Sequence, residues 1–213
     1  ERLSLSRRFG LWALPMTHST FAILLGGMLT PNPRLAATLD GARVIAADGG
    51  MRHARALGLT PELWVGDFDS TPAALLAEWP DVPRMPYPAA KAATDGEIAV
   101  AEALARGATR ILLVGALGGD RSDHAFQLYL SAIRLAEDGL DILMTSGEEE
   151  ALPLLPGQKH LDLPEGALFS VLGLTALDGL TIVNARYPLD NFHLPFGSSR
   201  TVSNVANGRS EEH

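Results

Sequence analysis

Cysteine is absent from this sequence, and its absence excludes several kinds of chemistry. Disulfide bonds, thiolate nucleophiles and cysteine-type zinc sites all need the missing side chain. A chain without disulfides fits the reducing cytoplasm, which is the location we expect.

Long apolar runs and basic blocks are missing as well. No apolar run approaches the roughly 20 residues of a membrane-spanning helix. The longest basic run is Arg7-Arg8, and the formal net charge is −8, from 17 Lys and Arg against 25 Asp and Glu. We therefore expect neither nucleic acid nor an anionic membrane as a partner. A phosphorylated substrate is still compatible with this charge, because a divalent cation can link carboxylates to phosphate.

The composition does provide a folded core. Hydrophobic residues make up 46% of the chain and charged residues 20%, which is typical of a globular protein. Residues 1–20 stand apart as a poorly specified leader: an apolar run follows Arg7-Arg8, but Pro15 interrupts it and no clean cleavage site follows.

Residues 21–147 alternate between strand and helix patterns. Helical segments start at Pro33, at Met51, at Pro72 and after Thr94, where Thr94 and Glu97 have the form of a capping box. Between the helical segments lie short apolar runs that end in glycine or acidic residues: 21–25, 43–47, 63–65, 109–114 and 140–144. This alternation predicts an α/β domain with a mainly parallel, Rossmann-like sheet. The proline-rich stretch 80–88 is expected to be an extended, helix-free connection.

The pattern changes after residues 147–151, where we place the domain boundary. Helical periodicity disappears, and short apolar runs are separated by turns that contain proline and glycine. The expected strands are 161–163, 167–174, 180–185 and 201–205. Residues 151–213 are therefore predicted to form a small antiparallel β-sandwich.

Gly66-Asp67-Phe68-Asp69-Ser70 is the stretch with the clearest chemical content. Two carboxylates, Asp67 and Asp69, follow a buried strand, at the place where ligands bind in open α/β sheets. Neighbouring carboxylates repel each other, and a hard cation such as Mg²⁺ would offset the repulsion. A solvated turn explains the same residues equally well when the stretch is taken alone.

Further polar clusters follow other predicted strands. Asp48-Gly49-Gly50 and the segment from Gly115 to His124 would share one edge of a parallel sheet with Asp67 and Asp69. Asp48 could equally be a helix cap, and His124 a structural histidine. Arg121 and Lys91 could contact phosphate, although a solvated lysine is the commoner case. Capping alone explains Thr94, and the helix dipole could explain Asp95.

Together these motifs resemble the thiamine pyrophosphokinase family. The residues that carry the resemblance occur in family order: Asp48-Gly49-Gly50, Gly66 to Ser70, Lys91 with Thr94-Asp95, Gly115 to Gly119 with Arg121 and Asp123-His124, and Ser203-Asn204. The resemblance covers roughly residues 21–205. No single motif decides it, but their common order is specific.

The resemblance implies an activity, a set of site residues and an assembly. The hydroxyl of thiamine would attack the β-phosphorus of ATP, giving thiamine diphosphate and AMP. Mg²⁺ would be held by Asp67, Asp69 and Asp95, which form the expected catalytic group. The other site residues implied are Asp48, Lys91, Thr94, Arg121, Asp123 and His124 for ATP, and Ser203 and Asn204 for thiamine. The resemblance also implies a homodimer, with thiamine between the α/β domain of one subunit and the sandwich of the other.

The sequence departs from the family pattern in three places. Ala92 replaces the aspartate that usually follows the lysine, and Asp120 lengthens the loop before His124 by one residue. The family normally has further strands after the Ser203-Asn204 motif, so we expect an additional segment there.

Two other functions are kept open by the residues. Asp67-Phe68-Asp69-Ser70-Thr71 has the form of a haloacid dehalogenase-type phosphatase motif, with Asp67 as nucleophile. That motif normally follows the first strand, whereas two predicted strands precede it here. Ala92 leaves open a third hypothesis, a catalytically weak module that binds thiamine or nucleotide.

Overall fold

A computed structural model describes residues 19–69, 71–88, 93–119 and 121–208 of the chain. The chain divides into two compact units, Glu1–Pro156 and Gly157–His213. Of the expected leader, residues 1–18 lie outside the described residues, and Thr20 is already the first residue of a strand.

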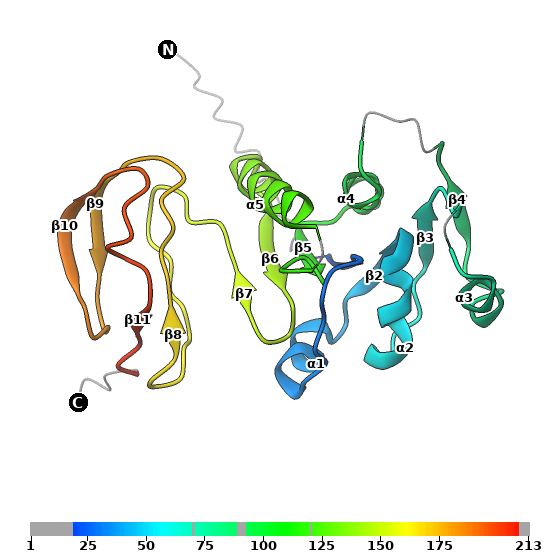
Figure 1. Ribbon diagram of the computed structural model, residues 1–213, viewed down its shortest axis with the longest axis horizontal. Helices are drawn as coiled ribbons and strands as arrows, with labels where there is room; N and C mark the ends of the chain where they lie inside the picture. The colour runs from blue at the N-terminus through cyan, green and yellow to red at the C-terminus, as the bar shows by residue number, and fades with distance from the viewer. Residues whose placement is uncertain (1–18, 70, 89–92, 120, 209–213) are drawn as a thin grey trace, which may run out of the picture. The chain divides into compact units, whose positions relative to one another are not determined.

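The first unit is built on a seven-stranded sheet with the order β4-β3-β2-β1-β5-β6-β7 (Figure 1). Neighbouring strands are parallel except for β7, which is antiparallel to β6. This architecture confirms the predicted α/β class. The strands are β1 (Thr20–Leu24), β2 (Arg43–Ala47), β3 (Leu63–Gly66), β4 (Arg84–Pro86), β5 (Arg110–Val114), β6 (Asp141–Thr145) and β7 (Glu150–Ala151).

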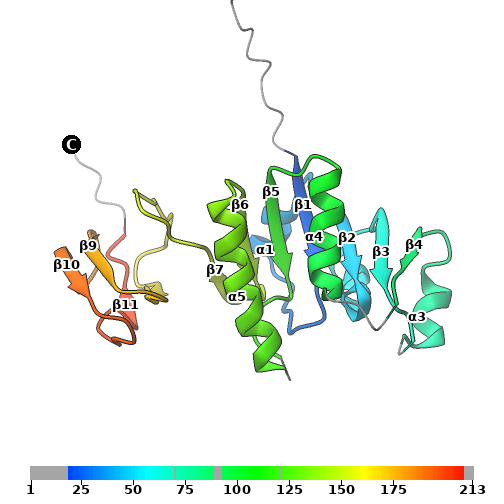
Figure 2. The same ribbon diagram turned by 90° about the horizontal axis from the view of Figure 1, so that it is seen from above.

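Helices cover both faces of this sheet. Figure 2 shows α4 and α5 in front of the strands and α1 behind them. The helices of the unit are α1 (Pro33–Leu39), the 3-10 helix η1 (Asp48–His53), α2 (Ala54–Leu57), α3 (Ala73–Glu78), α4 (Asp95–Ala105) and α5 (Ser122–Glu137). The capping box expected at Thr94 and Glu97 forms on α4, Asn32 caps α1, and Gly58 ends α2 in the left-handed conformation.

Two apolar clusters separate along the pleat of the strands. In β1, Phe21 and Ile23 face the cluster that includes α4 and α5, whereas Ala22 and Leu24 face the cluster that includes α1 and α2. Successive side chains of a strand point to opposite faces, so a strand that is buried on both sides must be apolar throughout. This requirement explains the continuous apolar runs in the sequence.

Two local features differ from the sequence prediction. The segment 80–88 is extended as expected, but part of it, β4, pairs with β3 and forms an edge strand. Edge strands tolerate prolines because only one side needs backbone donors. The helix expected from Met51 begins earlier, as η1 at Asp48, whose backbone has φ of +43°.

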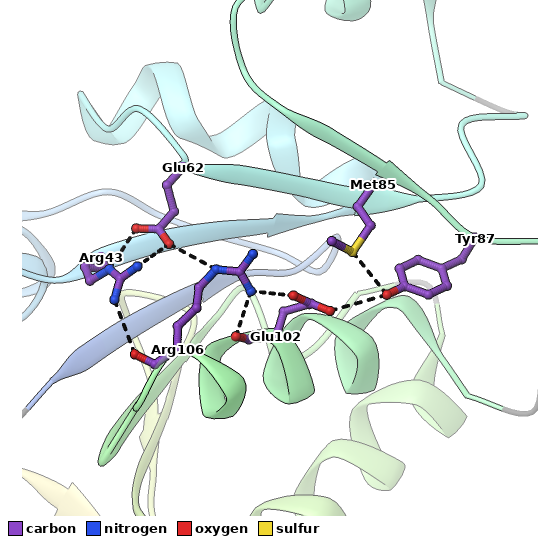
Figure 3. Close-up of polar contacts among 6 residues, drawn as sticks. All are labelled: Arg43, Glu62, Met85, Tyr87, Glu102 and Arg106. Atoms are coloured by element: carbon purple, nitrogen blue, oxygen red, sulfur yellow. Dashed lines mark hydrogen bonds and ion pairs between the residues drawn. The ribbon is translucent and has the colours of Figure 1, made fainter.

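A chain of polar contacts fastens the end of α4 to the starts of β2 and β3 (Figure 3). Glu62 accepts two hydrogen bonds from Arg43, at 2.7 and 2.8 Å, and also pairs with Arg106. Arg106 in turn pairs with Glu102, which accepts a hydrogen bond from the hydroxyl of Tyr87. Arg43 and Glu62 lie at the amino ends of their strands, so this part of the network stabilises the sheet away from its carboxyl edge.

The second unit contains small antiparallel sheets, as predicted. One pairs β9 (Leu177–Ile182) with β10 (Leu189–Leu194), and the other pairs β8 (Leu168–Phe169) with β11 (Asn204–Val205). The strand expected at 161–163 does not form, and β10 was not predicted. Residues 189–194 carry polar side chains between their apolar ones, which concealed the strand in the sequence.

Candidate functional site at the carboxyl edge of the sheet

The connections of the sheet reverse direction at β1. From β1 the chain proceeds through β2, β3 and β4 on one side and then returns to β5 on the other. In open parallel sheets, ligands bind at the carboxyl ends of the strands beside such a switch point. Parallel pairing places Asp48, Asp67 and the loop that begins at Gly115 at this same edge, as the sequence predicted for parallel strands.

Glycines let the backbones that leave β1, β2 and β5 approach each other closely. The Gly27 N–H donates to the Gly115 carbonyl at 3.0 Å. A Cβ atom on Gly27 would lie 2.4 Å from that oxygen, and one on Gly50 would lie 2.1 Å from the Leu24 carbonyl oxygen. Only glycine fits at these two positions, so backbone atoms alone form the surface there. We call the glycines at this edge, Gly26, Gly27, Gly49, Gly50 and Gly115, the glycine floor.

Asp48 is held beside the end of β3. The indole N–H of the fully buried Trp64 donates to the Asp48 carbonyl at 2.9 Å. A Cβ atom on Gly66 would lie 3.3 Å from the Asp48 Cα, which shows how closely the two strand ends approach. Asp48 makes no side-chain cap on η1, so the capping interpretation from the sequence does not account for its carboxylate.

Asp67 and Asp69 lie on a short turn after β3. The Asp69 N–H donates to Asp67 Oδ1 at 3.0 Å, and Phe68 between them has φ of +62°. The Phe68 ring packs edge-on against Trp64, with centroids 5.2 Å apart. This contact fixes the turn on the core, while Asp69 is exposed and Asp67 is half-buried.

The N-terminus of α4 supplies Thr94 and Asp95. A Cβ atom on Gly96 would lie 3.0 Å from Leu25 Cδ2, so the helix begins directly over the end of β1. The Thr94 hydroxyl accepts from the Glu97 N–H and pairs with the Glu97 carboxylate, which satisfies it as a cap. Asp95 is half-buried in the first helical turn.

Arg121, Asp123 and His124 lie at the start of α5 and are exposed. Arg121 binds the Asp123 carboxylate through two hydrogen bonds, of 2.9 and 2.7 Å. The guanidinium holds the pKa of the Asp123 carboxyl well below its usual range and raises the pKa of Arg121. The two residues therefore form one neutral, charge-separated pair.

Lys91, together with Ala92 and Asp120, lies outside the described residues. The chain that leads to Lys91 is fixed at Tyr87, whose N–H donates to the Gly66 carbonyl at 2.9 Å.

Arg52 and His53 were not predicted to belong to the site. Arg52 Nη2 donates to the carbonyls of Gly26 and Gly27, and His53 Nε2 lies 3.0 Å from the Gly27 carbonyl. Neither residue is distinctive in the sequence, because both look like ordinary residues of a helical segment. Burial lowers the pKa of His53, and the charge of Arg52 acts in the same direction.

The acidic residues fit a magnesium ion that arrives with a substrate. In the described part of the chain, no three Asp, Glu or His side chains converge into a closed metal site. Mg²⁺ keeps several waters and is commonly held by one or two carboxylates together with substrate phosphates. Asp67 and Asp69, on one turn at the strand end, offer that kind of donor set.

In the second unit, Ser203 and Asn204 begin the pairing of β11. Ser203 has φ of +60°, and its N–H donates to the hydroxyl of Ser170 at 3.0 Å. The Asn204 amide is buried: it accepts from the Tyr187 N–H at 3.0 Å and donates to the Tyr187 carbonyl at 2.8 Å. Asn204 thus fastens the segment at Tyr187, and Ser203 is the more exposed of the two residues.

Comparison with protein families identifies both units. Residues 38–144 match the model of the thiamin pyrophosphokinase catalytic domain, and residues 158–212 match that of its vitamin B1 binding domain. The chain belongs to the thiamin pyrophosphokinase family. This family member is an enzyme, and its activity is that of a thiamine pyrophosphokinase.

Solved structures of the family share its fold. The thiamine pyrophosphokinase of Bacillus subtilis is 22% identical, with a TM-score of 0.76 over 89% of this chain and 95% of that one. A thiamin pyrophosphokinase family protein of Enterococcus faecalis is 25% identical, with a TM-score of 0.69 over 89% and 90%. The thiamin pyrophosphokinase of Candida albicans is 14% identical, with a TM-score of 0.67 over 89% and 83%.

These findings do not favour the phosphatase or the catalytically weak binding module. Asp67 follows the third strand of the sheet in sequence, not the first, and both units match domains of one pyrophosphokinase family. A comparison with curated protein sequences finds no significant match. The described helices include none that is long and apolar enough to span a membrane.

Proposed function

We propose that this thiamine pyrophosphokinase transfers the pyrophosphate group of ATP to thiamine at the carboxyl edge of the seven-stranded sheet. The observation that carries this proposal is the meeting of Asp48, the Asp67–Asp69 turn and the glycine floor beside the switch point at β1. Bare backbone and carboxylates at such an edge suit a phosphate chain that is accompanied by a cation.

The reaction forms one bond and breaks another. The hydroxyl oxygen of thiamine bonds to the β-phosphorus of ATP, the bond from that phosphorus to the bridging oxygen of the α-phosphate breaks, and AMP leaves. The hydroxyl proton is released in the same step. Phosphoryl transfer of this kind needs positioning and charge neutralisation more than a covalent nucleophile.

We assign the roles by element. Asp67 and Asp69 on the turn after β3, with Asp95 at the start of α4, would hold Mg²⁺. When bound, the ion would neutralise charge on the phosphates and orient them. The expected ATP contacts are Asp48, Lys91, Thr94, Arg121, Asp123 and His124, of which Arg121 and Asp123 act as a pair.

We assign thiamine to the second unit and propose a homodimer. Ser203 and Asn204 are the expected thiamine contacts, with the buried Asn204 amide keeping the loop in shape for Ser203. Several large apolar side chains of this unit are exposed in the single chain, among them Leu168, Val183 and Phe196, and they support pairing of two copies.

ATP labelled at the γ-phosphate tests the reaction. Pyrophosphate transfer carries the label into a thiamine product that bears both phosphates, without accumulation of thiamine monophosphate. Release of the label as free phosphate, together with a phosphorylated Asp67, would instead support the phosphatase.

We also propose that the enzyme works in the cytoplasm, the compartment that supplies ATP. Fractionation of cells followed by immunoblotting tests this location. Recovery of the protein in the secreted or membrane fraction would contradict it.

A further inference from the structure

Arg52 and His53 both contact the backbone of the segment that follows β1. Arg52 reaches the Gly26 and Gly27 carbonyls through a single terminal nitrogen, Nη2, at 3.2 Å from the second. His53 Nε2 lies 3.0 Å from the same Gly27 carbonyl. His53 is half-buried and Arg52 is exposed, so Arg52 is the residue of the pair that a ligand can reach more easily.

The guanidinium lies over the glycine floor of the site. Its Nη1 would be 3.5 Å from a Cβ on Gly49 and 4.0 Å from one on Gly26. Gly49 follows β2 and Gly26 follows β1. The next residue, Gly27, is hydrogen-bonded to Gly115, which follows β5. Arg52 is therefore next to the switch point.

The remaining nitrogens of Arg52 are available to an anion. Within the described residues, every hydrogen bond of Arg52 comes from Nη2, which leaves Nε and Nη1 for another acceptor. Arg121, by contrast, already gives Nε and Nη2 to Asp123. Two backbone carbonyls hold the Arg52 side chain in place beforehand, which lowers the entropy cost of binding a ligand.

We propose that Arg52 binds the phosphate chain of the nucleotide and that His53 positions it through the Gly27 carbonyl. This inference rests on the proposed nucleotide site. Nε and Nη1 lie on different edges of the guanidinium, so each can donate to a separate phosphate oxygen while the positive charge of Arg52 offsets the charge of the anion. Arg52 supplies a cation on the β1–β2 side of the switch point, across from the paired Arg121.

Calorimetric titration of metal-free protein with adenosine and with a non-hydrolysable ATP analogue, in the absence of thiamine, tests the role of Arg52. In Arg52→Ala, the affinity for the analogue should fall about tenfold or more, while the affinity for adenosine should be unchanged. Arg52→Lys keeps the charge but offers a single nitrogen, and its affinity for the analogue should lie between those of the wild type and Arg52→Ala. Arg55→Ala is the matched control, because Arg55 lies one turn further along and pairs with Glu78 on the surface.

An equal loss of affinity for adenosine and for the analogue would show that Arg52 only shapes the loop. Unchanged affinity for both would also overturn the proposal. If Arg52→Ala does not fold, as judged by its thermal unfolding, Arg52→Lys gives the same comparison. A selective loss in a protein that forms no AMP with thiamine would uphold Arg52 and refute the reaction instead.

His53 is tested by its conservative variant. His53→Ala should raise the KM for ATP while leaving kcat nearly unchanged, and His53→Gln, which can still donate to the Gly27 carbonyl, should restore the KM. A fall in kcat alone, or failure of glutamine to restore the KM, would contradict a positioning role.

Discussion

Asp67 and Asp69 share one turn but are held differently. Asp67 is half-buried and accepts the Asp69 N–H, so one of its oxygens serves the turn. Asp69 is exposed, and its carboxylate accepts no hydrogen bond from the residues that the structure describes. The folded chain can therefore lose the charge of Asp69 with little structural consequence, whereas a site that holds a cation cannot.

We accordingly expect Asp69→Asn to lower turnover by about 100-fold or more, because the substitution removes a charge that neutralises the transferring phosphates. Its free energy of unfolding should change by less than about 0.5 kcal/mol, as for other surface substitutions. Steady-state kinetics over a range of Mg²⁺ concentrations and urea unfolding measure the two effects. Asp81→Asn, an exposed aspartate before β4, is the control. A variant that unfolds in metal-free buffer would make Asp69 a structural residue.

His53 gives the stability of the protein a dependence on pH. Burial lowers its pKa in the folded state, with the Arg52 charge acting in the same direction. Below about pH 6.5, the unfolded chain therefore binds the proton more readily than the folded one. Stability should be complete above that pH and should decrease as the pH falls toward the lowered pKa.

His53→Gln should flatten this decrease between about pH 7 and pH 5.5, a range above the usual titration of carboxylates. Chemical unfolding at a series of pH values measures the slope. His160→Gln, which removes an exposed imidazole from the second unit, is the matched control. An unchanged slope in His53→Gln would show that other groups cause the pH dependence.

At the scale of elements, the ends of β1 and β5 meet without side chains between them. Gly26 and Gly27 are neighbours with different surroundings. A Cβ on Gly27 would lie 2.4 Å from the Gly115 oxygen, whereas the nearest atom to a Cβ on Gly26 is 3.9 Å away. Neither glycine has a positive φ, so space alone distinguishes them.

Gly27→Ala should therefore cost about 2 kcal/mol of stability or more, because it forces the two strand ends apart. It should also weaken the binding of nucleotide. Gly26→Ala should change stability by less than about 1 kcal/mol. Thermal unfolding of both variants measures the contrast, and equal effects would mean that the close contact is not important for the fold.

The elements also show what could be predicted from sequence. Runs such as Arg43–Ala47 were predictable because both of their faces are buried, and α4 because Thr94 and Glu97 form a local cap. The strand β4 and the early start of η1 depend on contacts with distant segments, namely pairing with β3 and the Trp64 hydrogen bond to Asp48. Local patterns do not contain this information.

The residues of the site divide in the same way, into those that local sequence predicts and those that depend on distant contacts. Asp67 and Asp69 could be found because acidic residues after a buried strand are distinctive in the sequence. Arg52 and His53 could not, since their importance comes from the carbonyls of Gly26 and Gly27, which precede them by more than twenty residues in the chain. The bonds that engage Arg121 with Asp123 and Asn204 with Tyr187 were likewise visible only in the folded chain.

At the scale of the whole molecule, the second unit carries exposed apolar side chains that a single chain does not cover. Sedimentation velocity should give about twice the 22.6 kDa of one chain, if two copies pair as proposed. Phe196→Asp should shift the protein toward the monomer, because a buried charge opposes association. Ser199→Asp, at a nearby exposed position, should not. A wild-type protein that sediments as a monomer at all concentrations would contradict the homodimer.

In the proposed reaction, thiamine accepts the pyrophosphate of ATP. The direct measurement is a coupled assay for AMP in which thiamine, ATP and Mg²⁺ are omitted one at a time. We predict AMP only when all three are present, at a rate that saturates with thiamine. AMP formed without thiamine, or no AMP with thiamine while another alcohol is turned over, would contradict thiamine as the acceptor.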